Sequence, residues 1–232
     1  MKGFKKLITY FTITEICLWF FSIAFIITSF CIFDRENYLT LFASIVGITA
    51  LIFCAKGNPI GQVLMVFFSI VYGVISYSFR YYGEMLTYLG MTLPMATFAL
   101  ISWLKNPFKG KRSEVTVNTL NKKDFIVISI SAILVTTAFY FILSAFNTAN
   151  IVFSTISITT SFIAVFLTFK RSPYFALVYA LNDVVLIVLW TLASLVDIKY
   201  ISVVVCFIAF LVNDLYGFIN WQRMKNRQQK SQ

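Results

Sequence analysis

Two acidic residues interrupt long apolar stretches in the C-terminal part of the chain. Asp183 is the one charged residue between positions 174 and 196, and Asp214 is the one charged residue between positions 200 and 221. An ionised side chain at membrane depth costs about 2.5–3.5 kcal/mol on insertion scales, so each must face protein or a watery path. Carboxylates there can bind sugar hydroxyls and base edges, couple transport to ions, or act as aspartyl catalysts or metal ligands.

Aromatic and amide side chains accompany Asp183 at helical spacing. Tyr179, Asp183 and Trp190 are four and seven residues apart and therefore share one face of a helix, with Asn182 adjacent. Such a set suits a ribosylated base, because carboxylate and amide groups bind hydroxyls while Trp190 stacks on the ring. If the ring is a cation, stacking gains a cation-π contribution of about 0.5–2 kcal/mol.

The last apolar stretch carries a similar set. Asn213, Tyr216 and Asn220 form one helical stripe beside Asp214, and Tyr216 can also stack on a ring. The structural alternative for these polar groups is hydrogen bonding between helices, at roughly 0.6 kcal/mol each.

A further polar strip lies between positions 60 and 79. Gln62, Ser69, Tyr72 and Ser76 follow one another at intervals of seven, three and four residues on an otherwise apolar helix. The candidate binding residues are therefore Gln62, Tyr72, Tyr179, Asn182, Asp183, Trp190, Asn213, Asp214, Tyr216 and Asn220.

The elements that position these residues must be transmembrane helices. The composition is 59% hydrophobic and only 12% charged, whereas soluble domains are roughly 45–50% apolar and 25% charged. A membrane helix needs about 20 apolar residues, and transmembrane strands would need alternating polarity that is absent here. The predicted spans are 14–33, 38–55, 60–79, 85–104, 125–146, 151–169, 174–196 and 200–221. The fold class is thus an all-α membrane protein with about eight transmembrane helices.

The residue types argue against catalysis. The chain has no histidine, which removes histidine-based triads, histidine proton relays and most catalytic zinc sites. No metal-binding spacing accompanies the two intramembrane acids. We therefore expect no enzyme activity, no cofactor and no metal.

The basic residues predict the topology. With eight spans, sixteen of the nineteen Lys and Arg residues fall on the side of the termini, and only Arg35, Arg80 and Lys199 fall opposite. This asymmetry predicts a multi-pass protein of the cell membrane with both termini in the cytoplasm. It explains the net charge of +10 without a nucleic-acid partner. The basic loop 105–123 is expected to determine topology next to anionic lipid and to do nothing more.

The two halves of the chain resemble each other. Residues 56–59 (KGNP) correspond to 170–173 (KRSP), and 93–103 (LPMATFALISW) correspond to 211–221 (LVNDLYGFINW). Three helices in each half, joined by one linking helix, give a parallel repeat. The predicted parts are an extra N-terminal helix (1–37), a first bundle (38–104), a basic loop with linker helix (105–149), a second bundle (150–222) and a basic tail (223–232).

Several short motifs then resemble the PnuC nicotinamide riboside transporters. They are Gly57-Asn58-x-x-Gly61-Gln62, Tyr72-Gly73, Tyr82-Gly83-Glu84-Met85, Leu93-Pro94-Met95 and Asn213-x-x-Tyr216-Gly217-x-x-Asn220-Trp221. The resemblance spans the chain from about residue 38 onward. It implies a SWEET-like three-plus-one-plus-three core, a homotrimer, and facilitated diffusion of a nucleoside that a cytoplasmic kinase then traps.

The substrate stays open between several compounds. Many nicotinamide riboside members carry Pro-Met-Gln where this chain has Pro94-Met95-Ala96, and a Trp-rich segment where it has Ser172-Pro173-Tyr174. The alternatives are a (deoxy)nucleoside, thiamine or riboflavin, and ion-coupled symport is an alternative mechanism. A membrane-embedded enzyme and a receptor are the alternatives of a different class.

Overall fold

The computed structural model describes residues 10–78 and 85–231. Within this part, eight helices are long and apolar enough to cross a membrane, which confirms the predicted number. In chain order the elements are α2 (Ile13–Phe33), α3 (Tyr38–Ala55), α4 (Pro59–Ser78), the π-helix η1 (Thr87–Thr92), α6 (Leu93–Lys105), β1 (Pro107–Phe108), β2 (Lys111–Val115), α7 (Lys122–Ala145), α8 (Ile151–Phe169), α9 (Tyr174–Ser194), the 3-10 helix η2 (Ile198–Tyr200) and α10 (Ile201–Gln229). Arg80 and the Tyr82-Gly83-Glu84 part of one family motif lie outside the described residues.

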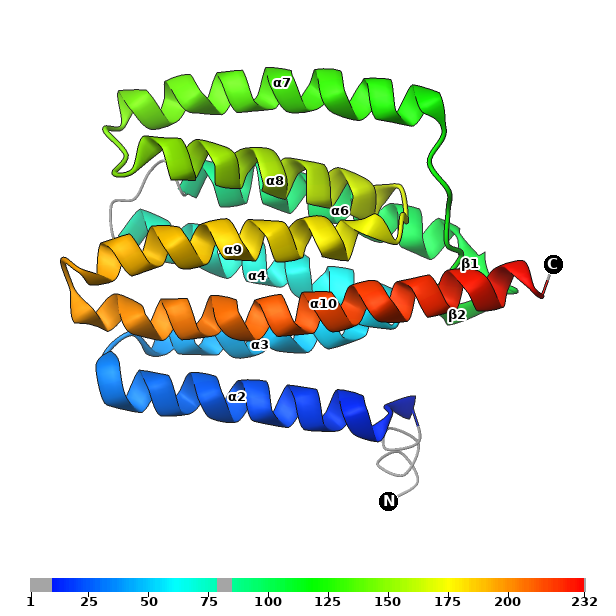
Figure 1. Cartoon of the computed structure of the whole chain (residues 1–232), viewed down its shortest axis with the longest axis horizontal. Helices are drawn as coiled ribbons and strands as arrows, with labels where there is room; N and C mark the ends of the chain where they lie inside the picture. The colour runs from blue at the N-terminus through cyan, green and yellow to red at the C-terminus, as the bar shows by residue number, and fades with distance from the viewer. Residues whose placement is uncertain (1–9, 79–84, 232) are drawn as a thin grey trace.

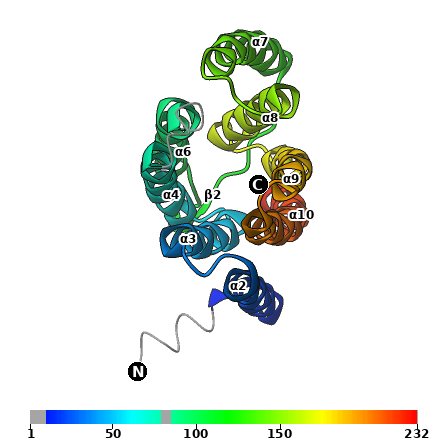
Figure 2. The same cartoon turned by 90° about the vertical axis from the view of Figure 1, so that its left-hand side faces the viewer.

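Six of these helices form a closed ring. Each helix packs on the next in the order α3, α4, α6, α8, α9 and α10, and α10 packs back on α3. The outer helix α2 packs on α3 and α10, and the outer helix α7 packs on α8. Figure 1 shows the helices lying side by side, with α7 and α2 at opposite edges. The end-on view in Figure 2 shows α3, α4 and α6 on one side and α8, α9 and α10 on the other, with α7 and α2 outside them.

Local signals explain where the helices begin. The outer helices α2 and α7 each start with a capping box, in which Thr12 pairs with Glu15 and Asn121 pairs with Asp124. Such a box satisfies two backbone N–H groups that have no partner inside the helix. Helix α4 starts at Pro59, where proline removes no helical hydrogen bond.

The equivalence of the two halves is visible in the ion pairs. Lys56 follows α3 and pairs with Glu15 at 3.0 Å, while Lys170 follows α8 and pairs with Asp124 at 2.8 Å. In both cases the acid is the third residue of the outer helix that precedes the bundle. The likeness between the halves therefore reaches α2 and α7 as well as the two predicted three-helix bundles.

The loop after α6 is a structured strap across one end of the ring. Its strands β1 and β2 pair as a short antiparallel hairpin, which the sequence did not predict. Val115 N–H donates to the Gly57 carbonyl at 2.9 Å, and Asn118 N–H donates to the Arg171 carbonyl at 3.0 Å. Gly57 and Arg171 occupy equivalent turns and both have positive φ, 65° and 56°. The segment 105–123 thus does more than set topology, because it ties together the α3–α4 and α8–α9 turns.

Helix α10 continues beyond the predicted end of its span. It runs to Gln229, so most of the predicted tail 223–232 is helical. Gln228 explains the extension, since its side chain donates to the Val115 carbonyl at 3.0 Å and accepts from Val117 N–H at 2.8 Å. We call the end of the molecule that carries the strap and the C-terminal part of α10 the terminal end (Figure 1).

Candidate functional site

A cavity of about 170 Å³ lies inside the ring of helices. Five of the six ring helices (α3, α4, α8, α9 and α10) contribute lining residues, together with η1 and Leu143 of α7. The lining extends from Asp183 and Asp214 past Trp190 to Thr148 in the α7–α8 connection. That connection lies at the end opposite the terminal end (Figure 1), so the cavity extends away from the strap. Small-molecule sites typically measure roughly 300–1,000 Å³, so we expect the cavity to widen when a ligand enters.

Two buried carboxyl groups line the cavity. Asp183 on α9 and Asp214 on α10 are 3% and 5% exposed, and both line the cavity. The two carboxyl groups lie within hydrogen-bonding reach of each other. None of the lining residues is a lysine or an arginine. The cavity therefore contains two carboxyl groups and no positive side chain that could balance a negative charge on them.

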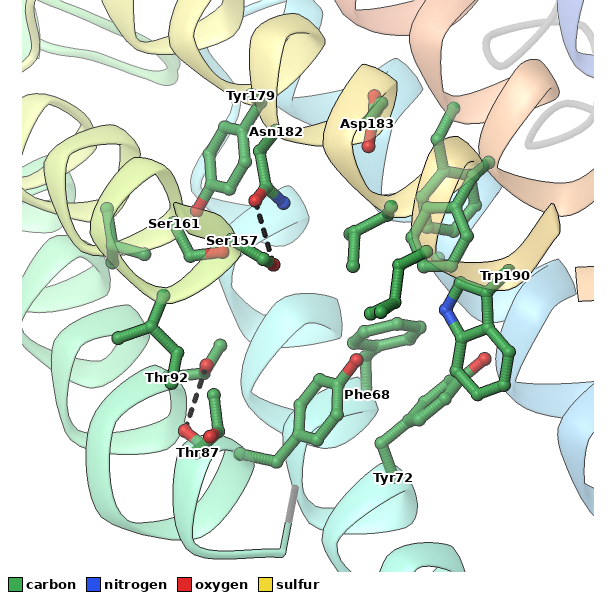
Figure 3. A pocket seen from close by; sticks show the side chains of 18 of the residues that line it. Phe68, Tyr72, Thr87, Thr92, Ser157, Ser161, Tyr179, Asn182, Asp183 and Trp190 are labelled. Carbon is green, nitrogen blue, oxygen red and sulfur yellow. Dashed lines mark hydrogen bonds between the residues drawn. The ribbon is translucent and has the colours of Figure 1, made fainter. Parts of the chain in front are cut away.

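Asn182 is held in one orientation by helix α8. Its Oδ1 accepts hydrogen bonds from Ser157 Oγ at 3.1 Å and from Thr160 Oγ1 at 2.7 Å. Figure 3 shows Asn182 between Tyr179 and Asp183, with Ser157 opposite. The two hydroxyl donors fix the amide, so its Nδ2 group is the donor that remains for a ligand.

Aromatic rings line the cavity between the acids and its outer part. Phe68 and Tyr72 on α4 have ring centroids 4.6 Å apart, and Tyr88 on η1 lies 5.0 Å from Tyr72. On the other side, Trp190 packs on Tyr200 at 5.3 Å. Figure 3 shows Phe68, Tyr72 and Trp190 in the same region, at some distance from Asn182. Planar rings bind well to such surfaces, and cationic rings gain a further electrostatic attraction.

The π-helical turn η1 brings hydroxyl groups to the cavity. Pro94 lacks an N–H group and cannot complete the α-helical hydrogen bond to residue 90, and the turn just before it is wide, with Leu93 N–H bonded to the Tyr88 carbonyl. Thr92 Oγ1 donates to the Thr87 carbonyl at 3.2 Å, and both threonines line the cavity (Figure 3). π-Helical turns occur frequently at functional sites. The chain just before Pro94 thus forms a π-turn that faces the cavity.

The chain matches the family model described as nicotinamide mononucleotide transporter over residues 37–223. It belongs to this transporter family. The chain is 22% identical over 200 residues to the nicotinamide riboside transporter PnuC of Neisseria mucosa. This alignment covers 84% of the chain and 76% of that protein. The crystal structure of the vitamin B3 transporter PnuC superposes with a TM-score of 0.79 at 20% identity, covering 94% of each chain. The resemblance noted in the sequence is therefore confirmed, and the transporter-family fold with it.

Six of the ten candidate residues of this family member line the cavity. They are Tyr72, Tyr179, Asn182, Asp183, Trp190 and Asp214. The shared helical face of Tyr179, Asp183 and Trp190 is thus turned toward the ring centre. Gln62 lines a small separate pocket to which Tyr179 also contributes. Its Nε2 donates to Cys54 Sγ at 3.3 Å.

The structure does not bring the other three candidates to the cavity. Asn213 Nδ2 donates to Ser22 Oγ at 2.9 Å, which joins α10 to α2. Tyr216 donates to Glu15 at 3.0 Å, also on α2. Asn220 donates to the Ala55 carbonyl at 2.7 Å, at the end of α3. These residues lie on the faces of α10 that pack against α2 and α3, so hydrogen bonding between helices accounts for them.

Hydroxyl residues of the site were missed in the sequence. Thr87, Thr92, Ser154, Ser157 and Ser161 all line the cavity. The signal that was available is the segment 154–161, where six of eight residues carry a hydroxyl. Serine and threonine also bond to the carbonyl of their own helix four residues back, as Thr155 and Thr159 do, so composition alone does not mark such a segment as a site.

Proposed function

We propose that this chain takes up nicotinamide riboside or a closely related nucleoside across the cell membrane. The family match and the name of the Neisseria relative support nicotinamide compounds as substrates. The cavity supports them too, since aromatic rings and polar side chains suit a ribosylated base. The proposed contacts are hydrogen bonds from the sugar or amide to Asn182, Asp183 and Asp214, and stacking of the base on Tyr72 or Trp190.

One observation favours the free nucleoside over the mononucleotide. A phosphate group needs cationic or backbone N–H partners, yet no lysine or arginine lines the cavity, and its buried charges are the carboxyl groups of Asp183 and Asp214. A phosphate in this place would meet charge of the same sign, which is strongly unfavourable in a dehydrated site. We therefore propose the riboside and not its phosphate.

Transport is proposed to be facilitated diffusion by alternating access. The described conformation has its cavity on the side away from the strap, and a buried cluster including Trp103, Phe175 and Trp221 fills the ring toward the terminal end. With both termini in the cytoplasm, this is an outward-facing arrangement. A rearrangement of the two halves would then open the terminal end and release the nucleoside inside the cell.

The remaining parts of the proposal rest on the family resemblance. They are a SWEET-like three-plus-one-plus-three core, a homotrimer in the cytoplasmic membrane, and trapping of the nucleoside by a cytoplasmic kinase. No enzyme activity of the chain itself is proposed, and the closed ring with one central cavity supports transport better than catalysis.

Uptake into proteoliposomes tests the proposal. The purified full chain should import labelled nicotinamide riboside down its gradient, and unlabelled mononucleotide should compete poorly. Competition by thiamine, riboflavin and a panel of ribo- and deoxyribonucleosides ranks the alternative substrates. Trp190→Ala should lower uptake, whereas Trp19→Ala on the outer helix α2 is the matched control. Binding without uptake would replace the transporter by a receptor, and chemical conversion of the ligand would indicate an enzyme.

Ion-coupled symport remains the alternative mechanism, because intramembrane acids can carry ions. The same liposomes, with the proton and sodium gradients collapsed, separate the two mechanisms. Uptake that continues supports uniport, and uptake that stops requires an ion partner.

A further inference from the structure

The carboxyl groups of Asp183 and Asp214 have no positively charged side chain beside them among the residues that line the cavity. Asp183 Oδ2 is buried and accepts no hydrogen bond from any donor among the described residues. The Asp183 carboxyl group lies within hydrogen-bonding reach of the carboxyl group of Asp214, another acceptor. The basic residues next to the spans are engaged elsewhere, as Lys56 pairs with Glu15 and Lys170 with Asp124. The two acids therefore depend on a proton or on a ligand.

Two carboxyl groups in contact cannot both be ionised without strong repulsion. A single proton placed between them turns one group into a donor and satisfies the acceptor of the other, as in paired-aspartate sites of enzymes. The pair then keeps one negative charge.

A metal ion does not fit this charge. Magnesium and calcium require about six or more oxygen ligands, and the part of the chain that the structure describes contains no group of three or more acidic, cysteine or histidine side chains that could hold one. The walls are instead aromatic, with Phe68, Tyr72 and Tyr179 among the lining residues. Aromatic faces next to one negative charge are the surroundings that bind organic cations.

We propose that Asp183 and Asp214 share one proton and present a single negative charge, and that this charge selects substrates whose planar ring carries one positive charge. The inference deepens the proposed function and rests on it. Nicotinamide riboside, with its pyridinium ring, belongs to this class. Thiamine, with its thiazolium ring, belongs to it too, whereas riboflavin and the common nucleosides are neutral.

A matched pair of ligands tests the charge alone. Nicotinamide riboside and its reduced 1,4-dihydro form have the same sugar and the same amide, but only the first has a cationic ring. Calorimetric titration of the full chain should show at least about 30-fold tighter binding of the cationic form, the lower range expected for losing a buried charge partner. Equal binding of the two forms by the unmodified protein would overturn the inference and leave nucleoside transport intact.

Substitution of the acids tests whether the pair supplies the charge. In Asp183→Asn or Asp214→Asn one carboxylate remains, although both ligands can bind more weakly through the altered contact. The ratio of the affinity for the cation to the affinity for the reduced form should stay within about threefold of that of the unmodified protein. The double variant should lose the preference for the cation and still bind the reduced form, which also shows that it is folded. Loss of the preference for the cation in either single variant, or a preference that survives in the double variant, would overturn the inference.

The pH dependence supplies an independent measurement. As the pH falls, uptake of a second proton removes the charge of the pair, so affinity for the cation should fall while affinity for the reduced form stays constant. The other titratable groups that face the acids or the cavity are Cys54 on α3, Tyr72 on α4, Tyr88 on η1, Tyr179 on α9 and Cys206 on α10. Thiols and phenols are neutral when protonated and stay protonated as the pH falls, so they do not change the charge of the cavity. A flat profile for the cation would contradict the shared proton.

The experiment also separates the inference from the proposed function. Tight binding of thiamine with no binding of any nucleoside would refute the proposed substrate and support cation selection. Tight binding of a neutral deoxynucleoside would support nucleoside transport and refute selection of cations.

Discussion

Trp103 and Trp221 close the terminal end of the ring by equivalent hydrogen bonds in opposite directions. Trp103, at the end of the first bundle, donates its indole N–H to the Thr168 carbonyl of the second bundle at 2.9 Å. Trp221, at the end of the second bundle, donates to the Cys54 carbonyl of the first bundle at 2.8 Å. The two rings lie 5.4 Å apart, and both are fully buried. Each tryptophan thus adds a second donor to a carbonyl in the last turn of a helix, since the Cys54 and Thr168 carbonyls also accept from Gly57 N–H and Arg171 N–H.

The residue before each tryptophan repeats the relationship. Ser102 Oγ donates to the Phe169 carbonyl at 2.8 Å, and Asn220 Nδ2 donates to the Ala55 carbonyl at 2.7 Å. The acceptors are the last residues of α8 and α3. This explains why Asn220, predicted to bind substrate, lies away from the cavity. These four bonds join the two halves at the end that must open if substrate is to leave toward the strap.

Trp221→Phe should weaken this closure, because phenylalanine keeps an aromatic ring but lacks the indole N–H and is smaller. The Cys54 carbonyl would keep the Gly57 N–H donor and lose the indole donor, at a cost of about 0.5–1.5 kcal/mol for one hydrogen bond. We expect a lower unfolding temperature and faster modification of Cys54, which is 4% exposed, by a thiol reagent added from the terminal side in a variant lacking the other cysteines. Trp19→Phe is the matched control, because Trp19 donates to Thr49 on the outside of the ring. Equal effects of the two substitutions would argue against a closure role.

Ser157→Ala combined with Thr160→Val should lower substrate affinity through Asn182. The two hydroxyl groups hold Asn182 Oδ1, and without them the amide can rotate away from the cavity. The loss of one ordered hydrogen bond to substrate corresponds to about tenfold in affinity. Thr136→Val is the control for a lost hydroxyl, since Thr136 bonds to Thr159 on the α7 side of α8. Calorimetric affinity should fall only in the Ser157 and Thr160 variant.

The sequence predicted the helices better than the faces they present. Apolar length is a property of each segment, so the eight spans follow from it directly. Asp183 and Asp214 were identified because a charge in hydrocarbon needs a partner wherever the helix packs. For Asn213 and Tyr216, helical spacing gives a stripe but not its direction, and here the stripe faces Ser22 and Glu15 on α2.

The parts that were missed depend on contacts between distant segments. The strap between α6 and α7 is ordered by the carbonyls of Gly57 and Arg171, which only the folded ring brings together. A proline inside a helix can be accommodated by a kink or by a wide turn, and the sequence does not show which of the two forms. At Pro94 the wide turn η1 forms. Thr87 and Thr92 reach the cavity only because the π-turn was formed.

Pro94→Ala tests the role of that turn. The new N–H group can complete an α-helical hydrogen bond, which would convert the π-turn to α-helix and rotate Thr87 and Thr92 relative to the cavity. We expect substrate affinity to fall by about tenfold, the equivalent of one hydrogen bond, with no loss of thermal stability. Pro59→Ala is the control, because Pro59 stands in the first turn of α4. Unchanged affinity in the Pro94 variant would mean that η1 does not contribute to binding.

Gly61→Ala should destabilise the closure of the terminal end by forcing α4 away from α3. A Cβ atom at Gly61 would lie 2.6 Å from the backbone nitrogen of Cys54 and 2.9 Å from the Ala50 carbonyl oxygen, so α3 and α4 would have to separate. Such overpacking typically costs about 1–3 kcal/mol. Gly90→Ala is the matched control, as its Cβ would meet nothing within 4 Å. Because Cys54 also supplies the carbonyl that Trp221 binds, the Gly61 variant should show both a lower unfolding temperature and the increased Cys54 labelling expected of Trp221→Phe. A drop in stability without increased labelling would separate the packing of α3 on α4 from the closure by Trp221.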